Sequence, residues 1–290
     1  MADAIAAFYR GTVTVRAALF TRRPHEYEAL GAATGRTREE LTAEYASRDL
    51  WLAWQDDRVV GVMQPWRRPD GKYGLDYGPT APDAYAVLAA RIPGESVTTV
   101  DAADTAALAA FDTAGFARVR VEDRYSIPVR ALDVPIPRGL DTVSAADTEL
   151  DALMALDSAL REDVPGGAGW RPDKQWFRRQ NHDSPYFDPE TYLVALDGAR
   201  YVGLMRIWNG PRPQPRLGLI GVLPEYRRRG LARALLAQGF AVLAARGETR
   251  VIAEADRTNV ASTTLLSSLG GVVTGSDVEL LRPPAQSSGL

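Results

Sequence analysis

The segment Arg227–Ala232, which reads Arg-Arg-Arg-Gly-Leu-Ala, has the residue types and spacing to bind a phosphate group. It follows an apolar run, 217–223, that predicts a buried strand ended by Pro224, and it leads into apolar residues at helical spacing. The first N–H groups of a helix have no partner within the helix, and the dipole makes that end positive. Gly230 has no side chain and Ala232 only a methyl group, so a phosphate can approach the backbone. We therefore predict a pyrophosphate-binding turn between a strand and a helix.

Three adjacent arginines also have two simpler explanations, a solvated helix start or a nucleic-acid patch. The strand before them and Gly230 after them favour a phosphate ligand, to which the arginines add charge-assisted hydrogen bonds. A nucleotide P-loop would require Gly-Lys-Ser or Gly-Lys-Thr, and a dinucleotide fold would require Gly-x-Gly-x-x-Gly. The sequence contains neither pattern, which argues against both classes of nucleotide site.

A second segment predicts a helix that begins at Asn259, carries Leu265 and Leu269 on its apolar face and ends at Gly270. Together the basic turn and this helix resemble the two signatures of the GNAT superfamily of acyltransferases. The first signature is Arg or Gln, two variable residues, Gly, one variable residue, then Gly or Ala. The second is an Asn that opens a helix ended by Gly. The resemblance covers about residues 140–282 and implies acetyl-CoA as the co-substrate, with no metal.

The resemblance also implies how coenzyme A would be held. The strand backbone pairs with the pantetheine arm, the amides of the turn and the first helical turn hold the pyrophosphate, and Asn259 contacts the pantetheine or the adenosine end while capping its helix. The implied cofactor-binding residues are Ile220, Gly221, Val222, Arg227, Arg228, Arg229, Gly230, Leu231, Ala232, Arg233 and Asn259.

Acetyl transfer from a thioester to an amine by direct attack needs a base for the amine, a donor to the carbonyl oxygen and an acid for the leaving thiolate. The resemblance implies the backbone N–H of Val222 as the donor. Many family members use a Tyr as the acid, but Leu266 occupies that position here. Ser262, Ser267, water or an unassisted departure of the thiolate remain the alternatives.

The base is less clearly marked. The strand 217–223 carries no carboxylate, although many GNAT proteins have a Glu there. Glu254 is our first choice, because a charge within an apolar strand is costly unless it has a partner or a function. Asp256, Glu162 and Asp163 are the alternatives, and each of these carboxylates could equally be an ordinary surface group. Four aromatic residues could shape the acceptor pocket or serve the core: Trp170, Trp176, Tyr186 and Phe187.

The elements that must position these residues occur twice in the chain. Arg58–Trp66 is similar to Arg200–Trp208, 142 positions later, and both fit the second strand of a hairpin. Leu108–Phe116 is similar to Thr263–Gly271, 155 positions later, and both fit a helix closed by Gly. Because the spacing grows by 13 positions, the first copy has lost residues between its hairpin and its last helix.

We therefore predict an α/β fold of two tandem GNAT-like domains, each a central mixed β-sheet flanked by helices. Residues 1–130 form a degenerate domain without a phosphate loop, and residues 138–290 form the catalytic domain. In the first copy, Asp104 stands where the second has Asn259, so this copy is not expected to bind coenzyme A strongly. The prolines within 128–137 indicate a linker. This layout resembles tandem acetyltransferases of the mycothiol synthase type.

Composition narrows the class of protein further. The 290 residues include no Cys and two His, so thiolate catalysis and disulfides are excluded and a multi-His metal site is disfavoured. The net charge of −3 argues against a general nucleic-acid binder. No uncharged apolar stretch approaches the ~18 residues of a membrane span, and Met1–Ala4 do not begin a secretory signal. We expect a cytoplasmic protein, and a monomer, because a tandem copy can bury the surface that a dimer would use.

These inferences converge on an acetyl-CoA-dependent N-acetyltransferase that modifies a primary amine of a small-molecule acceptor, within a ternary complex. Two alternatives stay open. The missing Tyr and the missing strand carboxylate also fit a non-catalytic acyl-CoA-binding regulatory module. Recognition of pantetheine does not fix the acyl chain, so the enzyme could use a different acyl-CoA.

Overall fold

The computed structural model describes residues 14–46, 48–210 and 213–284, so Met1–Ala4 lie outside the described residues. The chain divides into two compact units. One runs to Val119 and takes in the chain from Val278 onward, and the other is Arg120–Asp277. This division differs from the expected linker at 128–137, because Val129, Leu132 and Ile136 pack against the core of the second unit.

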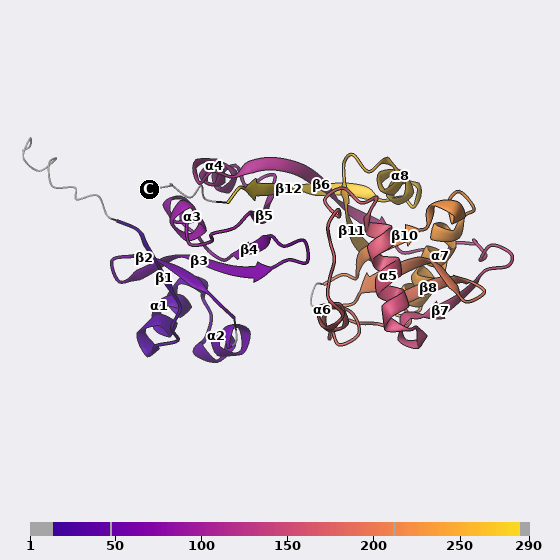
Figure 1. Ribbon diagram of the computed structural model, residues 1–290, viewed down its shortest axis with the longest axis horizontal. Helices are drawn as coiled ribbons and strands as arrows, with labels where there is room; N and C mark the ends of the chain where they lie inside the picture. The colour runs from indigo at the N-terminus through magenta and orange to yellow at the C-terminus, as the bar shows by residue number, and fades with distance from the viewer. Residues whose placement is uncertain (1–13, 47, 211–212, 285–290) are drawn as a thin grey trace, which may run out of the picture. The chain divides into compact units, whose positions relative to one another are not determined.

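The first unit has five strands in the order β1-β2-β3-β4-β5. Neighbouring strands from β1 to β4 are antiparallel, and β4 and β5 are parallel. Helices α1 and α2 lie below the strands and α3 and α4 above them (Figure 1). The elements are β1 (Arg16–Leu19), α1 (Pro24–Thr34), α2 (Arg38–Tyr45), β2 (Trp51–Gln55), β3 (Arg58–Arg67), β4 (Tyr73–Tyr77), α3 (Pro82–Ala89), β5 (Ser96–Asp101) and α4 (Thr105–Thr113).

The second unit has six strands in the order β6-β11-β10-β9-β8-β7, and β10 is parallel to β11. Two strands, β6 and β12, each contain residues of both units. The elements are β6 (Ala117–Pro128), β7 (Asp141–Ser144), the 3₁₀ helix η1 (Ala145–Asp147), α5 (Leu150–Arg161), α6 (Lys174–Gln180), β8 (Tyr192–Asp197), β9 (Arg200–Trp208), β10 (Arg216–Val222), the 3₁₀ helix η2 (Pro224–Tyr226), α7 (Leu231–Ala245), β11 (Arg250–Asp256), α8 (Val260–Ser268) and β12 (Val272–Arg282).

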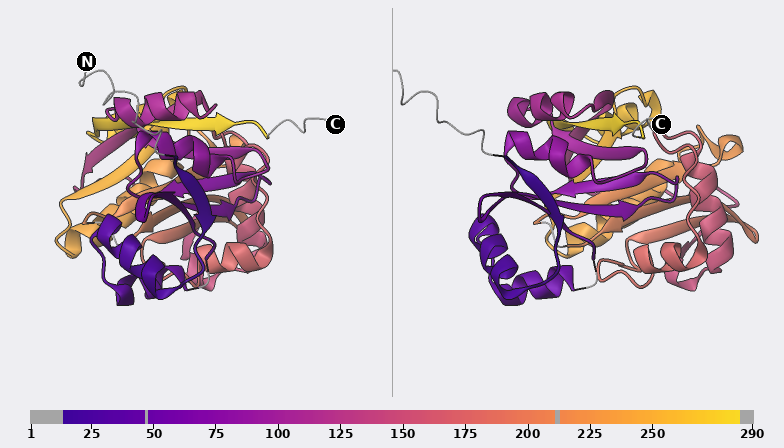
Figure 2. Two further views of the ribbon diagram at one scale, coloured as in Figure 1. Left: turned by 90° about the vertical axis from the view of Figure 1, so that its left-hand side faces the viewer. Right: turned by 60° about the vertical axis from the view of Figure 1, so that its left-hand side comes forward.

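Helices cover both faces of the second unit's strands. On one face, α7 and α8 bury Phe240 and Leu266 in a core with alternate residues of β11, such as Ala253. On the other face, α5 buries Leu156 and Leu160 in a separate core, and Figure 2 shows this helix from two further sides. Because side chains alternate along a strand, β11 presents its polar residues to the face opposite α7.

The two copies repeat in detail at their last helices. Asp104 caps α4 with φ −82° and ψ 75°, and Asn259 caps α8 with φ −80° and ψ 80°. Each cap accepts a hydrogen bond from the backbone N–H three residues later. The residues after the helices, Gly115 and Gly270, have φ values of 82° and 84°. The predicted α/β fold of two tandem copies is confirmed.

The missing residues of the first copy can now be located. After each hairpin, a backbone N–H donates a hydrogen bond back to the second strand of that hairpin. The donors stand at equivalent positions, Ala81 in the first unit and Leu223 in the second. In the first unit α3 then begins at once with Pro82 and has 8 residues. In the second, η2 and the basic turn intervene, and α7 begins only at Leu231 and has 15 residues. The first unit therefore lacks the turn that was predicted to hold phosphate.

Candidate functional site

The site in the second unit begins where β10 separates from β11. The two strands pair only at Arg216 with Ile252 and at Leu217 with Ala253, and β10 is irregular between Leu217 and Leu219. Beyond that point the register gives β10 no partner on its β11 side. Backbone polar groups on such an open edge need a partner, and an extended ligand arm can supply one by pairing like an added strand.

The basic turn has an unusual backbone. Arg228 and Gly230 take positive φ values of 63° and 84°, a region that favours Gly. A side chain built at Gly230 would meet nothing within 4 Å. The glycine is therefore required by its backbone conformation within the protein, and the open space beside it leaves room for a ligand.

The N-terminus of α7 is open to a ligand. Its first intrahelical hydrogen bond runs from the Ala234 N–H to the Gly230 carbonyl, and no side chain caps the helix. The N–H groups of Leu231, Ala232 and Arg233 thus have no acceptor within the helix. Together with the dipole, they form an anion-binding end directly after the strand edge.

The arginines of the turn divide into two groups. Arg227 donates from Nε to the Val222 carbonyl at 2.9 Å and forms an ion pair with Asp163, so its guanidinium ties the turn to β10 and to the chain after α5. Arg228 and Arg229 are exposed. Arg233, also exposed, donates to the Ser268 hydroxyl at 3.3 Å. Because the Arg227 guanidinium is already paired with Asp163, we expect Arg228, Arg229 and Arg233 to provide the side-chain contacts to phosphate.

A buried polar network lies on the α5 face, and sequence reasoning missed it. Asp157 accepts hydrogen bonds from Arg161 Nε at 2.5 Å and Arg206 Nη1 at 3.4 Å, and Arg206 Nη1 donates to Asn181 Oδ1 at 2.5 Å. Asp157 is 1% exposed and Arg206 6%. The Arg206 Nε is shielded from solvent with no hydrogen-bond partner among the described residues. A charge in an apolar strand, the argument applied to Glu254, would have singled out Arg206 as well.

This network borders a cavity of about 140 Å³ that is also lined by Trp170, Trp176 and Trp208. The cavity adjoins the open stretch of β10. An added Cβ at Gly218 would lie 2.5 Å from Trp208 Nε1, and one at Gly221 would lie 3.0 Å from Leu160 of α5. Glycines thus let the cavity wall and α5 approach the strand that would hold the pantetheine arm.

The four aromatic candidates have separate locations. Trp170 and Trp176 line the cavity and meet edge to face, with ring centroids 5.6 Å apart. Phe187 stacks on His182 at 5.2 Å and packs against the α5 core. Tyr186 is 37% exposed and does not line the cavity. Of the four aromatic candidates, Trp170 and Trp176 therefore line this cavity, and Tyr186 and Phe187 do not.

Comparison with known proteins agrees with this geometry. Residues 153–270 match the model of the Acetyltransferase (GNAT) family. Two solved structures share the fold over nearly the whole chain. A GCN5-related N-acetyltransferase from Sphaerobacter thermophilus has a TM-score of 0.65 at 17% identity, covering 96% of this chain and 97% of that one. A tandem GNAT protein from the clavulanic acid biosynthesis pathway has a TM-score of 0.63 at 16% identity, covering 95% and 100%.

Residues 153–270 thus match the GNAT acetyltransferase family, and the chain as a whole has the fold of a tandem GNAT protein. Among curated relatives, the mycothiol acetyltransferase of Salinispora arenicola is 34% identical over 166 residues, which are 54% of this chain and 53% of that protein. The mycothiol acetyltransferase of Frankia alni is 31% identical over 196 residues, 61% of this chain and 57% of that protein. The chain spans little more than half the length of these curated relatives.

The last helix of the GNAT domain explains the departure at Leu266. This residue is 3% exposed and packs in the α7 core, so its position points away from solvent. Asn259 accepts a hydrogen bond from the Ser262 N–H at 3.1 Å and therefore acts as a helix cap. Ser262 is half-buried in the first turn of α8, and Ser267 is exposed.

The candidate bases all have partners within this GNAT domain. Glu254 accepts from Arg216 Nε at 2.8 Å. Asp256 is 5% exposed and accepts from the backbone N–H of Thr258 at 2.7 Å. The other two carboxylates are likewise paired, Glu162 with Arg171 and Asp163 with Arg227. The partner that the Glu254 argument required is therefore present, and a basic role for Glu254 would require Arg216 to move.

Within 14–46, 48–210 and 213–284, no group of three or more His, Asp or Glu side chains is arranged to hold a metal ion. Over the same ranges, every helix is too short or too polar to cross a bilayer.

Proposed function

We propose that this protein transfers an acetyl group from acetyl-CoA to a primary amine of a small-molecule acceptor. One observation carries the proposal: the open edge of β10 leads, through η2 and the basic turn, to an uncapped helix N-terminus with free N–H groups. An extended pantetheine arm would pair with residues 220–222, and the pyrophosphate would lie at Leu231–Arg233, beside the exposed arginines. The match of residues 153–270 to the acetyltransferase family supports the same ligand.

The proposed reaction is direct attack in a ternary complex. The amine nitrogen attacks the thioester carbonyl, a tetrahedral oxyanion forms, and the C–S bond breaks to release coenzyme A as a thiolate. The Val222 N–H is the proposed donor to the oxyanion, and orientation of the two substrates supplies much of the rate. Glu254 remains the proposed base for the amine proton, and Ser262 the proposed acid for the thiolate.

The acceptor would bind in the cavity beside β10. Its three tryptophans offer flat apolar surfaces, and the Arg206 Nε offers an unused hydrogen-bond donor. The curated relatives are named for mycothiol, and their likeness covers about half of this chain. That likeness and the small volume of the cavity support a small-molecule acceptor, without fixing which amine it is.

A second candidate function has its own support. Leu266 is buried at the position of the usual acid, and three of the four candidate bases, Glu254, Glu162 and Asp163, are paired with arginines. Such a domain could bind an acyl-CoA without turning it over and act as a regulatory module. An enzyme that uses a different acyl-CoA would also fit the same cofactor contacts.

One experiment separates these functions. The full chain is mixed with acetyl-CoA and a panel of primary amines, release of the coenzyme A thiol is followed with a chromogenic disulfide, and the acceptor is checked for an added acetyl mass. Binding of acetyl-CoA is measured in parallel by calorimetry. Thiol release that depends on the amine supports the enzyme, binding without release supports the regulatory module, and absence of binding at millimolar acetyl-CoA contradicts both.

A further inference from the structure

A further cavity lies in the first unit. It has a volume of about 470 Å³, within the range of small-molecule sites, roughly 300–1,000 Å³. It lies where β4 and β5 separate, because these parallel strands pair only at Tyr73 with Ser96 and at Gly74 with Val97. The second unit opens in the same way between β10 and β11. We call the first unit's opening the β4–β5 wedge.

The β4–β5 wedge has the opposite charge from the opening between β10 and β11 in the second unit. Three carboxylates line it, from Asp76, Asp101 and Asp104. Its one arginine, Arg68, forms an ion pair with Asp70 at 2.9 Å, so that charge is already matched. The second unit instead presents exposed arginines and free helical N–H groups at the corresponding place. The carboxylates of the β4–β5 wedge would repel phosphate groups, and the first unit lacks the turn whose backbone N–H groups would bind them.

Aromatic rings form another part of the wall. Tyr77, Tyr85 and Phe111 make one cluster, with centroids 4.4 to 5.1 Å apart, and Trp66 lies on the wall with Asp76. The Tyr77 hydroxyl is shielded from solvent and has no hydrogen-bond partner among the described residues. A buried hydroxyl without a partner is costly unless a ligand or water supplies one.

We propose that the β4–β5 wedge binds a small organic ammonium ion. Ring faces attract cations, and neighbouring carboxylates supply both charge and hydrogen-bond acceptors. The cavity volume, the three carboxylates and the unpartnered Tyr77 hydroxyl agree on this class of ligand. Partial desolvation raises the pKa of the Asp76 carboxyl, although a hydrogen bond from Trp66 and the charge of Arg48 both act to lower it. The charge of a bound cation would favour the ionised carboxylate and so offset the effect of that desolvation.

Two further arginines lie near the wedge and do not reverse its charge. Arg48 acts on Asp76 from outside the wall, and Arg282 lies near Tyr77. The Arg282 guanidinium donates to the Ile92 carbonyl at 2.8 Å, and burial lowers its pKa. Neither arginine lines the cavity, so a ligand inside it meets mainly carboxylates and rings. The proposal does not depend on the function proposed for the second unit.

Three probes with one carbon skeleton test the charge preference: tyramine, which is cationic, tyrosol, which is neutral, and 4-hydroxyphenylacetate, which is anionic. Calorimetry is performed on the full chain saturated with coenzyme A. Tyramine should bind more tightly than tyrosol, and the anion should not bind. Equal binding of tyramine and tyrosol, or no binding of tyramine at millimolar concentration, overturns the proposal.

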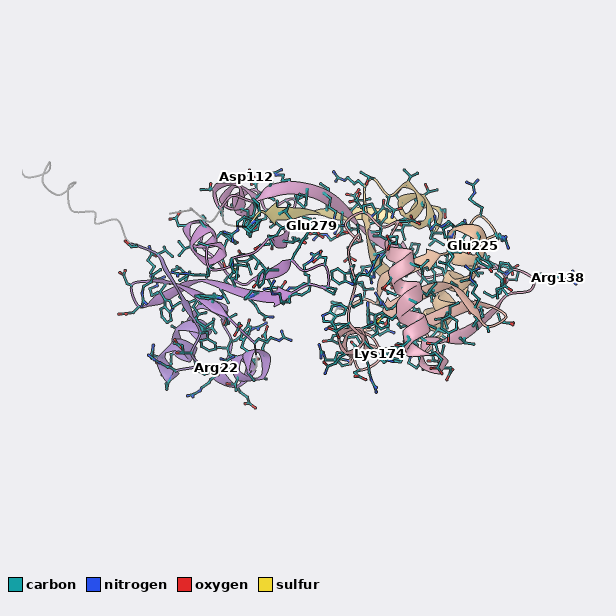
Figure 3. The ribbon with its side chains drawn as sticks, in the orientation of Figure 1. Arg22, Asp112, Arg138, Lys174, Glu225 and Glu279 are labelled. Atoms are coloured by element: carbon teal, nitrogen blue, oxygen red, sulfur yellow. The ribbon has the colours of Figure 1, made fainter. Side chains whose placement is uncertain are left out.

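Variants assign the binding to the wedge. Asp104→Asn should keep the cap of α4, because Asn259 caps α8 in the same conformation, and Asp76→Asn changes an exposed residue. Each should weaken tyramine binding by about tenfold to a hundredfold through loss of one charge-assisted hydrogen bond. Asp112→Asn, a matched change on α4 away from the wall (Figure 3), should leave it unchanged. Unchanged binding in both wall variants overturns the assignment, as does a second coenzyme A bound in this unit.

Discussion

Gly230 shows how one residue serves both the fold and the ligand. Its φ of 84° is strained for any other residue, yet a side chain there would enter open space. Two substitutions separate the effects. Gly230→Ala should cost about 1 kcal/mol of stability through backbone strain and leave acetyl-CoA binding largely intact.

Gly230→Glu adds a negative charge at the proposed phosphate position to the same strain. We expect similar stability to Gly230→Ala but loss of detectable acetyl-CoA binding, measured by calorimetry alongside thermal unfolding. Equal acetyl-CoA affinities in the two variants would place the phosphates elsewhere.

Arg206 is the residue whose loss should separate acceptor binding from cofactor binding. Arg206→Met would leave Asn181 Oδ1 without its donor and weaken the pairing of buried Asp157, at a cost of about 3 kcal/mol. The kcat/KM for the acceptor should fall while the affinity for acetyl-CoA stays the same.

A matched change on the same strand provides the control. Arg200 is exposed and pairs with the exposed Glu225, labelled in Figure 3, so Arg200→Met should cost under about 0.5 kcal/mol. Urea unfolding of both variants measures the difference. Equal losses of stability would mean that the Arg206 network contributes little.

Single residues also show where sequence reasoning stopped. The turn residues around Gly230 could be predicted, because their order along the chain is enough to define a helix N-terminus after a strand. The roles of Arg227 and Glu254 could not. Their partners, Asp163 and Arg216, lie 64 and 38 positions away, and only the folded chain brings them together.

Among the elements, α8 and α4 allow a direct exchange between the copies. Asn259→Asp places the first copy's cap in the second, so the stability of α8 should be retained, whereas Asn259→Ala should cost about 1 kcal/mol. If the Asn259 amide also contacts coenzyme A, Asn259→Asp should weaken acetyl-CoA binding without loss of stability. Calorimetry and thermal unfolding on both variants would show whether the residue is only a cap.

The periodic elements were the part of the fold that the sequence made predictable. The hairpins and the Gly-closed helices repeat local patterns that need no distant partner to be recognised. The opening of β10 from β11 was not predictable, because it depends on register between strands more than 30 positions apart. The packing of the proline segment 128–137 was not predictable either. Prolines predicted a linker, but apolar neighbours such as Ile136 pack it against the second unit.

At the scale of the whole molecule, we predict one coenzyme A per chain. The first unit passes from Ala81 directly into α3 and lacks the turn that offers amides to phosphate. Losing several charge-assisted hydrogen bonds should weaken binding there by orders of magnitude. Calorimetry should give a stoichiometry near one, and two sites of comparable affinity would contradict this.

The cytoplasmic location and the monomeric state stay predictions.

Truncation to residues 135–290 should give an insoluble protein. It removes β6, whose residues from Glu122 to Pro128 pair along the length of β11, and it removes Tyr125 and Ile127 from the second unit's core. An exposed β11 edge and a missing core layer both favour aggregation. A chain covering 117–277 keeps β6 and should be more soluble, as the soluble fraction and circular dichroism would show. Equal solubility of the two would contradict the structural role of β6.

The division of the chain between the units also affects the order in which they can be completed. The second unit is one continuous stretch, Arg120–Asp277, whereas the first also needs residues from Val278 onward. Proteins are synthesised from the N-terminus, and domains generally fold in that order as they emerge from the ribosome. In this chain the second unit is complete before the first. The unit whose synthesis begins first must wait, partly made, until the ribosome has delivered β12, and during that interval it is the part most in need of a chaperone.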